Sequence, residues 1–310
     1  MRWEERIGRR LRLRDLHTLQ AVVEWGSMAK AAEHLAISQP AISKAIADME
    51  HALGVPLFDR MPHGVELTPY GHVLLRRGSA IFDEIRQGLK EIEFLTDPAS
   101  GELRVGSTEP MTVIVSAVIE RLITRYPRMI FYAGVSDTTS LYEQLRERRI
   151  DFAITRMASS TAESDMDAEV LFEDPLAIVA SKQNPLARRR RVSLSELVHE
   201  PWTLPPAHGF LGRFIVEAFR VRGLQPPRTA VITSSAQLWY HLLATGRFLG
   251  VLPSVVLRLP GRHDHLITLP IPLPDTTRPI GLVRLRNRSL SPIAQLFIEE
   301  TRSVVRLVGE

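Results

Sequence analysis

The sequence feature that most constrains the fold is a pair of helix starts only eleven residues apart. The first is Ser27, which follows Gly26 and is placed to cap a short helix. The second is Ser38, with Pro40 in the first turn of the next helix, where a missing N–H costs nothing. Two short helices joined by a tight turn predict a helix-turn-helix at residues 28–47.

The residues on either side extend this motif to a winged domain over residues 15–71. Apolar residues at helical spacing predict a first helix over residues 15–25. Residues 55–68 predict a two-stranded ribbon that turns at Pro62-His63-Gly64, and a ribbon in this position is a wing. The second helix of the motif has an apolar inner face formed by Ile42, Ile46, Met49 and Leu53.

A long linker helix is predicted over residues 69–96. Seven positions, spaced alternately by four and three residues, carry five apolar side chains and two glycines. This spacing predicts a short coiled coil through which two chains dimerise. The alternative is an amphipathic helix whose apolar stripe packs on its own domain. The seven positions are Leu74, Gly78, Ile81, Ile85, Gly88, Ile92 and Leu95.

Residues 97–101 have the composition of a hinge, and strands alternate with helices after them. The alternation predicts parallel sheets covered by helices on both faces, as one large domain or as two lobes. We expect lobe 1 to comprise about residues 101–170 and 276–310, and lobe 2 about residues 171–275. The expected fold class is multi-domain α+β: a winged helix-turn-helix, a long linker helix and a C-terminal α/β domain.

Net charge alone does not identify a nucleic-acid-binding segment. The chain has a formal net charge of +4. Residues 1–14 hold six arginines and two glutamates, whereas residues 15–96 hold seven basic and eleven acidic residues, a net charge of −4. The first 14 residues are either a basic arm that follows DNA, a solvated tail, or the result of a start codon assigned too early. DNA binding by the winged domain would therefore depend on a few placed residues.

Composition and motifs exclude several classes of protein. The chain has no cysteine, which rules out disulfides, thiolate metal sites and a cysteine nucleophile. It lacks the HExxH, GxSxG, CxxC and Gly-rich phosphate-loop motifs, so we expect no enzyme, no metal site and no cofactor. No run of 18 apolar residues predicts a membrane span, and the Arg-rich N-terminus is not a secretory signal. We expect a cytoplasmic protein.

Residues 15–71 resemble the DNA-binding domain of LysR-type transcriptional regulators, and the remainder is similar to that family's periplasmic-binding-protein-like effector domain of two lobes. The resemblance implies a regulator that binds double-stranded promoter DNA and senses a small molecule between the lobes. Ala36 stands where the family more often has glycine or a polar residue, and we expect it to change only local hydration. The resemblance rests on Gly26-Ser27, Ala31-Ala32, Leu35, Ser38-Gln39-Pro40, Ser43, Glu50, Leu53-Gly54, Pro56-Leu57-Phe58, Arg60 and Leu67-Thr68-Pro69.

The second helix of such a motif enters the major groove with its N-terminal residues toward the bases. Gln39 can pair with adenine, Lys44 suits guanine or phosphate, and Pro40 offers an apolar surface to a thymine methyl. The start of the first helix is placed for phosphate contacts, and the wing for the flanking DNA. The predicted DNA-binding residues are Ser27, Met28, Lys30, Ser38, Gln39, Pro40, Ser43, Lys44, Arg60 and His63.

Small polar residues follow several predicted strands of the C-terminal domain, where open α/β sheets place ligands. Glu109 and Asp137 would favour a sugar-like effector, whereas Arg156 would favour a carboxylate metabolite. We interpret the four arginines at residues 188–191 as a solvated loop. The predicted effector-binding residues are Ser107, Thr108, Glu109, Ser136, Asp137, Thr138, Thr155, Arg156, Pro205, Phe210, Ser234 and Ser235.

The expected partners are promoter DNA, a small-molecule effector, RNA polymerase and further copies of the chain. The linker helices would hold a homodimer, and the effector domains would join two dimers into a homotetramer. Two competing hypotheses are a standalone solute-binding protein and a DNA-binding architectural protein without an effector. The predicted helix-turn-helix argues against the first, and DNA binding measured with and without metabolites tests the second.

Overall fold

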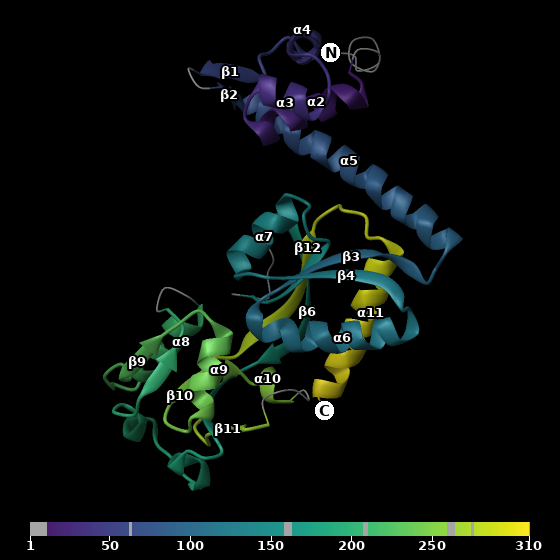
Figure 1. Ribbon diagram of the computed structural model, residues 1–310. Helices are drawn as coiled ribbons and strands as arrows, with labels where there is room; N and C mark the ends of the chain where they lie inside the picture. The colour runs from purple at the N-terminus through teal and green to yellow at the C-terminus, as the bar shows by residue number, and fades with distance from the viewer. Residues whose placement is uncertain are drawn as a thin grey trace. The chain divides into compact units, whose positions relative to one another are not determined.

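A computed structural model of the chain describes residues 11–61, 64–157, 163–206, 210–258, 264–273 and 276–309. The chain forms two compact units, Met1–Leu89 and Lys90–Glu310, and the boundary between them falls inside a long helix (Figure 1). Within the described ranges, no helix is both long enough and apolar enough to cross a membrane.

The first unit contains the predicted helix-turn-helix and wing. Both predicted caps are present: the Ser27 hydroxyl accepts a hydrogen bond from Lys30 N at 3.2 Å, and the Ser38 hydroxyl accepts one from Ala41 N at 3.4 Å. The two strands of the wing pair antiparallel. The elements are α2 (Leu13–Trp25), α3 (Met28–His34), α4 (Gln39–Leu53), β1 (Phe58–Met61), β2 (Gly64–Leu67) and the first part of α5 (Pro69–Thr96).

One apolar core joins these helices to the wing. Leu19, Ile42 and Leu57 are fully buried in it. The Glu50 carboxylate, near the end of α4, accepts hydrogen bonds from Leu57 N at 2.7 Å and Phe58 N at 3.3 Å. Because hydrogen bonds to a charged acceptor are strong and directional, Glu50 fixes the start of the wing against α4.

The turn between α3 and α4 corrects the expectation for Ala36. Its φ is +52°, in the left-handed region, which costs an L-residue about 1–2 kcal/mol. This conformation closes α3, because Ala36 N donates to Glu33 O at 3.2 Å and Ile37 N donates to Ala32 O at 3.0 Å. Ala36 therefore bears backbone strain at the centre of the motif, and its effect is not limited to hydration.

Replacing Ala36 with glycine is expected to stabilise the first unit by about 0.5–1 kcal/mol. Glycine removes the left-handed strain, and its greater freedom in the unfolded chain offsets part of the gain. Urea denaturation followed by circular dichroism measures the change. Ala47→Gly, within α4, is the matched control and should destabilise the unit by about 1 kcal/mol. A loss of stability in the Ala36 variant as well would contradict this interpretation.

The apolar stripe of α5 has different surroundings along its length. Near the start, Gly78 packs against Leu16 of α2, and Leu74 packs on the core of the first unit. This part of the stripe is buried within its own domain. The apolar side chains of the later part, Ile81, Ile85, Ile92 and Leu95, are 43–81% exposed, and Leu89 beside the stripe is 56% exposed.

The second unit folds around two sheets. In its described residues, the first sheet has the order β4-β3-β5-β12-β6, and helices α6, α7 and α11 pack on it in two apolar clusters (Figure 1). We call this assembly lobe 1. It comprises β3 (Ser100–Ser107), α6 (Thr112–Arg125), β4 (Arg128–Val135), α7 (Thr138–Arg146), β5 (Phe152–Arg156), β6 (Met166–Asp174), β12 (Arg278–Leu285) and α11 (Pro292–Gly309).

The second sheet has the order β11-β7-β10-β8-β9, and we call its assembly lobe 2. Its core includes the fully buried Trp202 and Phe219, whose rings meet edge to face. Lobe 2 comprises β7 (Leu176–Ser181), β8 (Trp202–Leu204), α8 (Phe210–Arg220), β9 (Thr229–Ile232), α9 (Ala236–Ala244), β10 (Leu249–Pro253), α10 (Val255–Arg258) and β11 (Leu266–Thr268).

The chain crosses between the lobes twice. β6 ends at Asp174 and β7 begins at Leu176, and the chain returns near Thr276 to form β12. β12 lies between β5 and β6 and runs antiparallel to both, and β10 runs antiparallel to β7. The expectation of parallel sheets is therefore met only in part: β3 pairs parallel with β4 and β5, and β8 with β9 and β10, but both sheets are mixed. The sequence pattern also fails to indicate β6, because acidic residues interrupt its apolar positions.

The expected hinge at residues 97–101 is a hydrogen-bonded turn. Ser100 N donates to Asp97 O at 3.1 Å, and Ala99 N donates to the Asp97 carboxylate at 3.2 Å. The same carboxylate accepts a hydrogen bond from Arg128 at 2.7 Å. These contacts fix the residues that follow α5 to lobe 1.

A buried carboxylate, Asp151, fixes the end of α5 itself. Arg288 Nη2 and the backbone N of Arg104 each donate to its oxygens at 3.0 Å. Lys90 Nζ, from α5, lies 3.6 Å from Asp151 Oδ2. Phe94 packs on the core of lobe 1 one turn further along. The last turns of α5 therefore belong structurally to the second unit.

Candidate DNA-binding surface and ligand cleft

A groove of about 470 Å³ runs between the start of α3, one side of α4 and the wing. Gln39 and Ser43 of α4 line it together with Ser27 and Met28 from the start of α3. Four of the predicted DNA-binding residues, from two separate helices, thus share one concave surface. The wing closes the other side of the groove with Phe58, Met61, Gly64 and Val65.

Hydrogen bonds inside this surface decide which polar atoms remain for DNA. The hydroxyl oxygens of Ser27 and Ser38 accept hydrogen bonds as helix caps, so each serine keeps its O–H donor. Ser43 Oγ donates to Met28 Sδ at 3.4 Å, which holds the Met28 side chain in the groove. Met28 can therefore reach a phosphate through its backbone N–H, in the first turn of α3, rather than through its side chain.

The side chains best placed to reach a duplex project from the first turns of the two helices. Gln39, Pro40 and Lys44 of α4 are exposed, as is Lys30 of α3. An exposed glutamine amide offers one donor and one acceptor, which match the edge of adenine, while the lysines can bind phosphates. His63 and the side chain of Arg60 lie outside the described part of the chain.

Eight of the twelve residues that line the groove are absent from the sequence-based prediction, among them Ala47 and Met61. Ala47 lies one helical turn after Ser43, so helical spacing could have placed it on this surface. Met61 lies on the wing, and no pattern in the sequence around it shows that the wing lies close to the α2–α3 turn. A Cβ at Gly64 would lie 2.8 Å from Gly26 O, so only glycine there lets the wing approach the α2–α3 turn.

In lobe 1, the predicted ligand residues gather at the carboxyl ends of β3, β4 and β5. β3 pairs parallel with both neighbours, so that Ser107 lies beside Val135 and Ile154. Arg156, at the end of β5, lies opposite Ile280 near the start of β12, where the chain returns from lobe 2. This edge of lobe 1 therefore faces the crossover.

The corresponding edge of lobe 2 faces the crossover as well. β10 ends at Pro253, opposite Leu176 at the start of β7, and β8 runs parallel to β10. Pro205 follows β8 at this edge. Ser235 caps α9 by accepting a hydrogen bond from Leu238 N at 3.3 Å, and Ser234 beside it is exposed. Phe210 begins α8, and its side chain is outside the described part.

Hydrogen bonds of hydroxyl and backbone groups stabilise the edge of lobe 1 that faces the crossover. Thr155 is fully buried, and its hydroxyl lies 2.8 Å from that of Thr138 at the start of α7. Thr108 N donates to Ile154 O at 3.2 Å, and Ser136 N donates to Ser107 O at 3.1 Å. The predicted residues that follow β3 and β4 are thus brought together, and Thr108 remains partly exposed.

The two acidic residues of this edge have different roles. Asp137 caps α7, and hydrogen bonds from the Ser140 side chain at 2.7 Å and the Ser140 backbone at 3.1 Å hold its pKa below the usual value. Its oxygens are therefore occupied. Glu109 is exposed and lies near Tyr240 of α9 in lobe 2. Burial, with the charge of Glu109 as the second cause, raises the pKa of Tyr240 to about 12.

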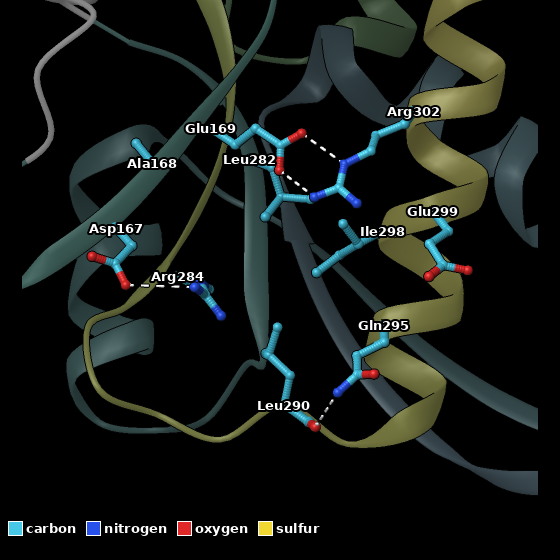
Figure 2. Close-up of a pocket in the computed structure, with 10 residues that line it drawn as sticks. All are labelled: Asp167, Ala168, Glu169, Leu282, Arg284, Leu290, Gln295, Ile298, Glu299 and Arg302. Carbon is cyan, nitrogen blue, oxygen red and sulfur yellow. Dashed lines mark hydrogen bonds and ion pairs between the residues drawn. The ribbon is translucent and has the colours of Figure 1, made fainter.

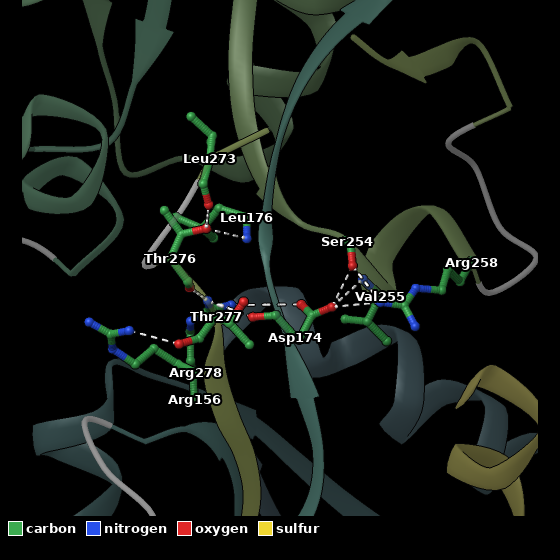
Figure 3. A network of polar contacts seen from close by, with 10 residues as sticks. All are labelled: Arg156, Asp174, Leu176, Ser254, Val255, Arg258, Leu273, Thr276, Thr277 and Arg278. Carbon is green, nitrogen blue, oxygen red and sulfur yellow. Dashed lines mark hydrogen bonds and ion pairs between the residues drawn. The ribbon is translucent and has the colours of Figure 1, made fainter. Parts of the chain in front are cut away.

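Arg156 is 6% exposed and holds the crossover strands together (Figure 3). Its guanidinium donates to Asp174 O at 2.8 Å and to Thr276 O, and Nη1 lies 3.7 Å from Asp174 Oδ2. Asp174 Oδ1 accepts hydrogen bonds from Ser254 Oγ at 2.6 Å and Val255 N at 3.1 Å. Burial lowers the pKa of Arg156 to about 10 and raises that of Asp174. This role removes the sequence-based argument for a carboxylate ligand.

Another cavity, of about 280 Å³, lies between β6, β12 and α11 in lobe 1 (Figure 2). Arg302 donates two hydrogen bonds of 2.7 Å to Glu169, and Arg284 lies 3.6 Å from Asp167. None of the predicted ligand residues lines this cavity. In the described residues, no group of three or more His, Asp or Glu side chains is arranged to hold a metal ion.

The winged helix-turn-helix and the two-lobed α/β domain define a class of protein: DNA-binding transcriptional regulators with a ligand-binding domain. Two family profiles match the chain. The "bacterial regulatory helix-turn-helix protein, lysR family" matches residues 13–72, and the "LysR substrate binding domain" matches residues 96–306. The chain belongs to the LysR family of transcriptional regulators, which are not enzymes.

Individual members of the family match this chain over nearly its whole length. The transcriptional regulator GbpR of Azospirillum brasilense is 28% identical over 95% of this chain and 86% of its own. The regulator YybE of Bacillus subtilis is 29% identical over 96% of this chain and 97% of its own. A full-length OxyR variant from Pseudomonas aeruginosa has the same fold, with a TM-score of 0.65 at 21% identity, covering 96% of this chain and 95% of its own. The structure of full-length CbnR complexed with its target DNA has a TM-score of 0.53 at 22% identity, and the match covers 95% of this chain and 100% of CbnR.

Proposed function

We propose that this LysR-family regulator binds promoter DNA as a dimer of dimers and changes promoter activity when a small molecule occupies the cleft between its lobes. The groove lined by Gln39 and the wing is the observation that carries the DNA contact. The hydroxyl-rich edge of lobe 1, which faces the crossover, supports the ligand site. RNA polymerase at the promoter is the proposed further partner, and the cytoplasm the proposed location.

Replacing Gln39 with alanine is expected to weaken binding to the operator about 10- to 100-fold, because a bidentate base contact contributes roughly 1–3 kcal/mol. Binding to unrelated duplex should change by less than about twofold, since phosphate contacts carry no sequence information. Fluorescence anisotropy with both duplexes measures the difference. Gln295→Ala, in α11, is the matched control. Equal losses on both duplexes would make Gln39 a structural residue.

The cleft favours a polyhydroxylated, sugar-like effector over a carboxylate. Arg156, the cation that would attract a carboxylate, is occupied at the crossover. Glu109 is exposed at the same edge, where its negative charge would repel an anion and its carboxylate oxygens would accept hydrogen bonds from hydroxyls. Thr108 supplies a partly exposed hydroxyl beside it.

Replacing Thr108 with alanine is expected to weaken the effector response about 3- to 10-fold, because one hydrogen bond contributes about 0.5–1.5 kcal/mol. Operator affinity without effector should stay unchanged. Operator binding titrated with a panel of sugars and carboxylate metabolites measures both quantities. A loss of operator binding in the variant would contradict the cleft assignment, and a response to carboxylates alone would contradict the proposed effector class.

The proposed assembly rests on two exposed apolar surfaces. The later part of the α5 stripe would join two chains into a dimer. Both sheets of the second unit end in partly apolar edge strands, β4 and β9, on which Ile130, Tyr132 and Ile232 are exposed. These edges would join dimers into a tetramer, since an uncovered edge strand is a template for association.

A further inference from the structure

The end of lobe 2 opposite the crossover is formed by loops that are far apart in the sequence. β10 and β11 both run antiparallel to β7, so the loop after β7 lies beside the loops that precede β10 and β11. Asn184 Nδ2 donates to Gly246 O at 2.9 Å, and Lys182 N donates to His265 O at 2.8 Å. The residue before β9, Arg228, joins the same end through Trp202 N, which donates to Arg228 O at 3.0 Å.

This end carries an excess of positive charge, and we call it the distal tip. All its basic side chains are exposed, and they come from three separate loops. Only Arg189 has an ion-pair partner among the described residues, Glu196 at 3.0 Å. The distal tip comprises Lys182, Arg188, Arg189, Arg190, Arg191, Arg228 and Arg247.

The distal tip belongs to a lobe that is positively charged as a whole, whereas lobe 1 is negatively charged. Residues 176–275 hold twelve basic and five acidic residues, a net charge of +7. Residues 97–175 and 276–310 together hold fourteen basic and seventeen acidic residues, a net charge of −3. Neighbouring guanidinium groups without a partner repel each other, and an anion bound between them relieves that repulsion. Their planar N–H donors match the geometry of phosphate oxygens. Such a surface fits a polyanion.

We propose that the distal tip is a second DNA-contacting surface, which binds phosphates outside the operator contacts of the helix-turn-helix and does so without regard to sequence. The winged domain itself offers few positive charges to the phosphates of DNA. Residues 15–96 have a net charge of −4, and Lys30 and Lys44 are the cations among the described side chains predicted to contact DNA. A second copy of the chain is a poorer partner, because carboxylates of lobe 1 such as Asp165 and Glu169 are already paired with arginines.

Salt dependence tests this inference on the full chain. The variant Arg188→Gln, Arg190→Gln, Arg191→Gln and Arg247→Gln should bind unrelated duplex at least about 10-fold more weakly at low salt. The slope of log affinity against log salt should fall by about 2–4, because each lost phosphate contact removes about 0.9. The preference for operator over unrelated duplex, which the Gln39 variant tests, should survive.

The control removes the same charge from lobe 1, with Arg121→Gln, Arg125→Gln, Arg149→Gln and Arg306→Gln, all at exposed positions. Its salt slope should match that of the parent. An equal fall in both variants would show an effect of net charge alone and overturn the proposal, as would an unchanged slope in the tip variant. The proposal would also be overturned if the tip variant lost binding to an acidic protein but kept its DNA binding.

The absence of cysteine permits a direct test. Arg190→Cys carrying a photo-crosslinker should crosslink to DNA on a duplex that contains the operator and long flanks. Glu147→Cys, exposed on lobe 1, should not. Operator binding without any crosslink from the tip would refute the contact while leaving the proposed function of the helix-turn-helix intact.

Discussion

Replacing Ile85 and Ile92 with aspartate is expected to convert the protein to monomers and to lower its operator affinity by more than about 100-fold. Both side chains belong to the exposed part of the α5 stripe, at 43% and 61% exposure. Burying an isoleucine contributes about 1.5–3 kcal/mol, and an aspartate in its place would be buried without a partner. A monomer also loses the gain from occupying two half-sites at once.

Light scattering at micromolar concentration and operator titration measure the two effects. Ile85→Leu with Ile92→Leu, which keeps the stripe apolar, should remain dimeric and bind normally. Circular dichroism should show that the first unit stays folded, because its core lies before Ile81. If the aspartate variant remained a dimer, the stripe of α5 would not be the dimer interface.

Replacing Asp151 with alanine is expected to destabilise the second unit by about 3–5 kcal/mol, because the change removes the carboxylate that faces the buried Arg288 and the largely covered Lys90. Arg288 and Lys90 are 2% and 11% exposed in this site. The backbone N–H of Arg104 loses its acceptor as well. The unfolding temperature should fall by about 10 °C, and fluorescence of the buried Trp202 and Trp239 reports it.

Asp165→Ala is the control, since Asp165 forms an exposed ion pair with Arg146 that should contribute less than about 1 kcal/mol. Asp151→Asn keeps the acceptor for Arg104 N and should lie between the parent and the alanine variant. Equal stability of Asp151→Ala and Asp165→Ala would show that the buried cluster does not stabilise the domain.

The grouping of Ser27, Gln39 and Ser43 on one candidate DNA-binding surface was largely predictable because its signals are local. Ser27 and Ser38 cap helices through contacts three residues away, and the spacing of one helix places Gln39 and Ser43 on the same face. The contribution of Met61 was not predictable. It depends on the wing lying against a turn almost forty residues earlier, and no pattern within either segment shows that contact.

The proposed ligand site was less predictable because its decisive contacts are not local. Arg156 lies at a strand end, where ligands often bind, but Thr276, 120 residues later, occupies its guanidinium. The same return of the chain places β12 between β5 and β6 and makes the sheet mixed. Sequence spacing shows where strands end, whereas the pairing of distant strands decides which side chains remain available to a ligand.

The position of β12 also sets an order of events during synthesis. The DNA-binding unit and lobe 2 are each built mainly from continuous segments, whereas the sheet of lobe 1 cannot close until residues 278–285 have left the ribosome. Because domains fold as they emerge, a nascent chain acquires its DNA-reading part first and its sensor last. A translation product that stops before β12 would therefore compete for operators without responding to the effector.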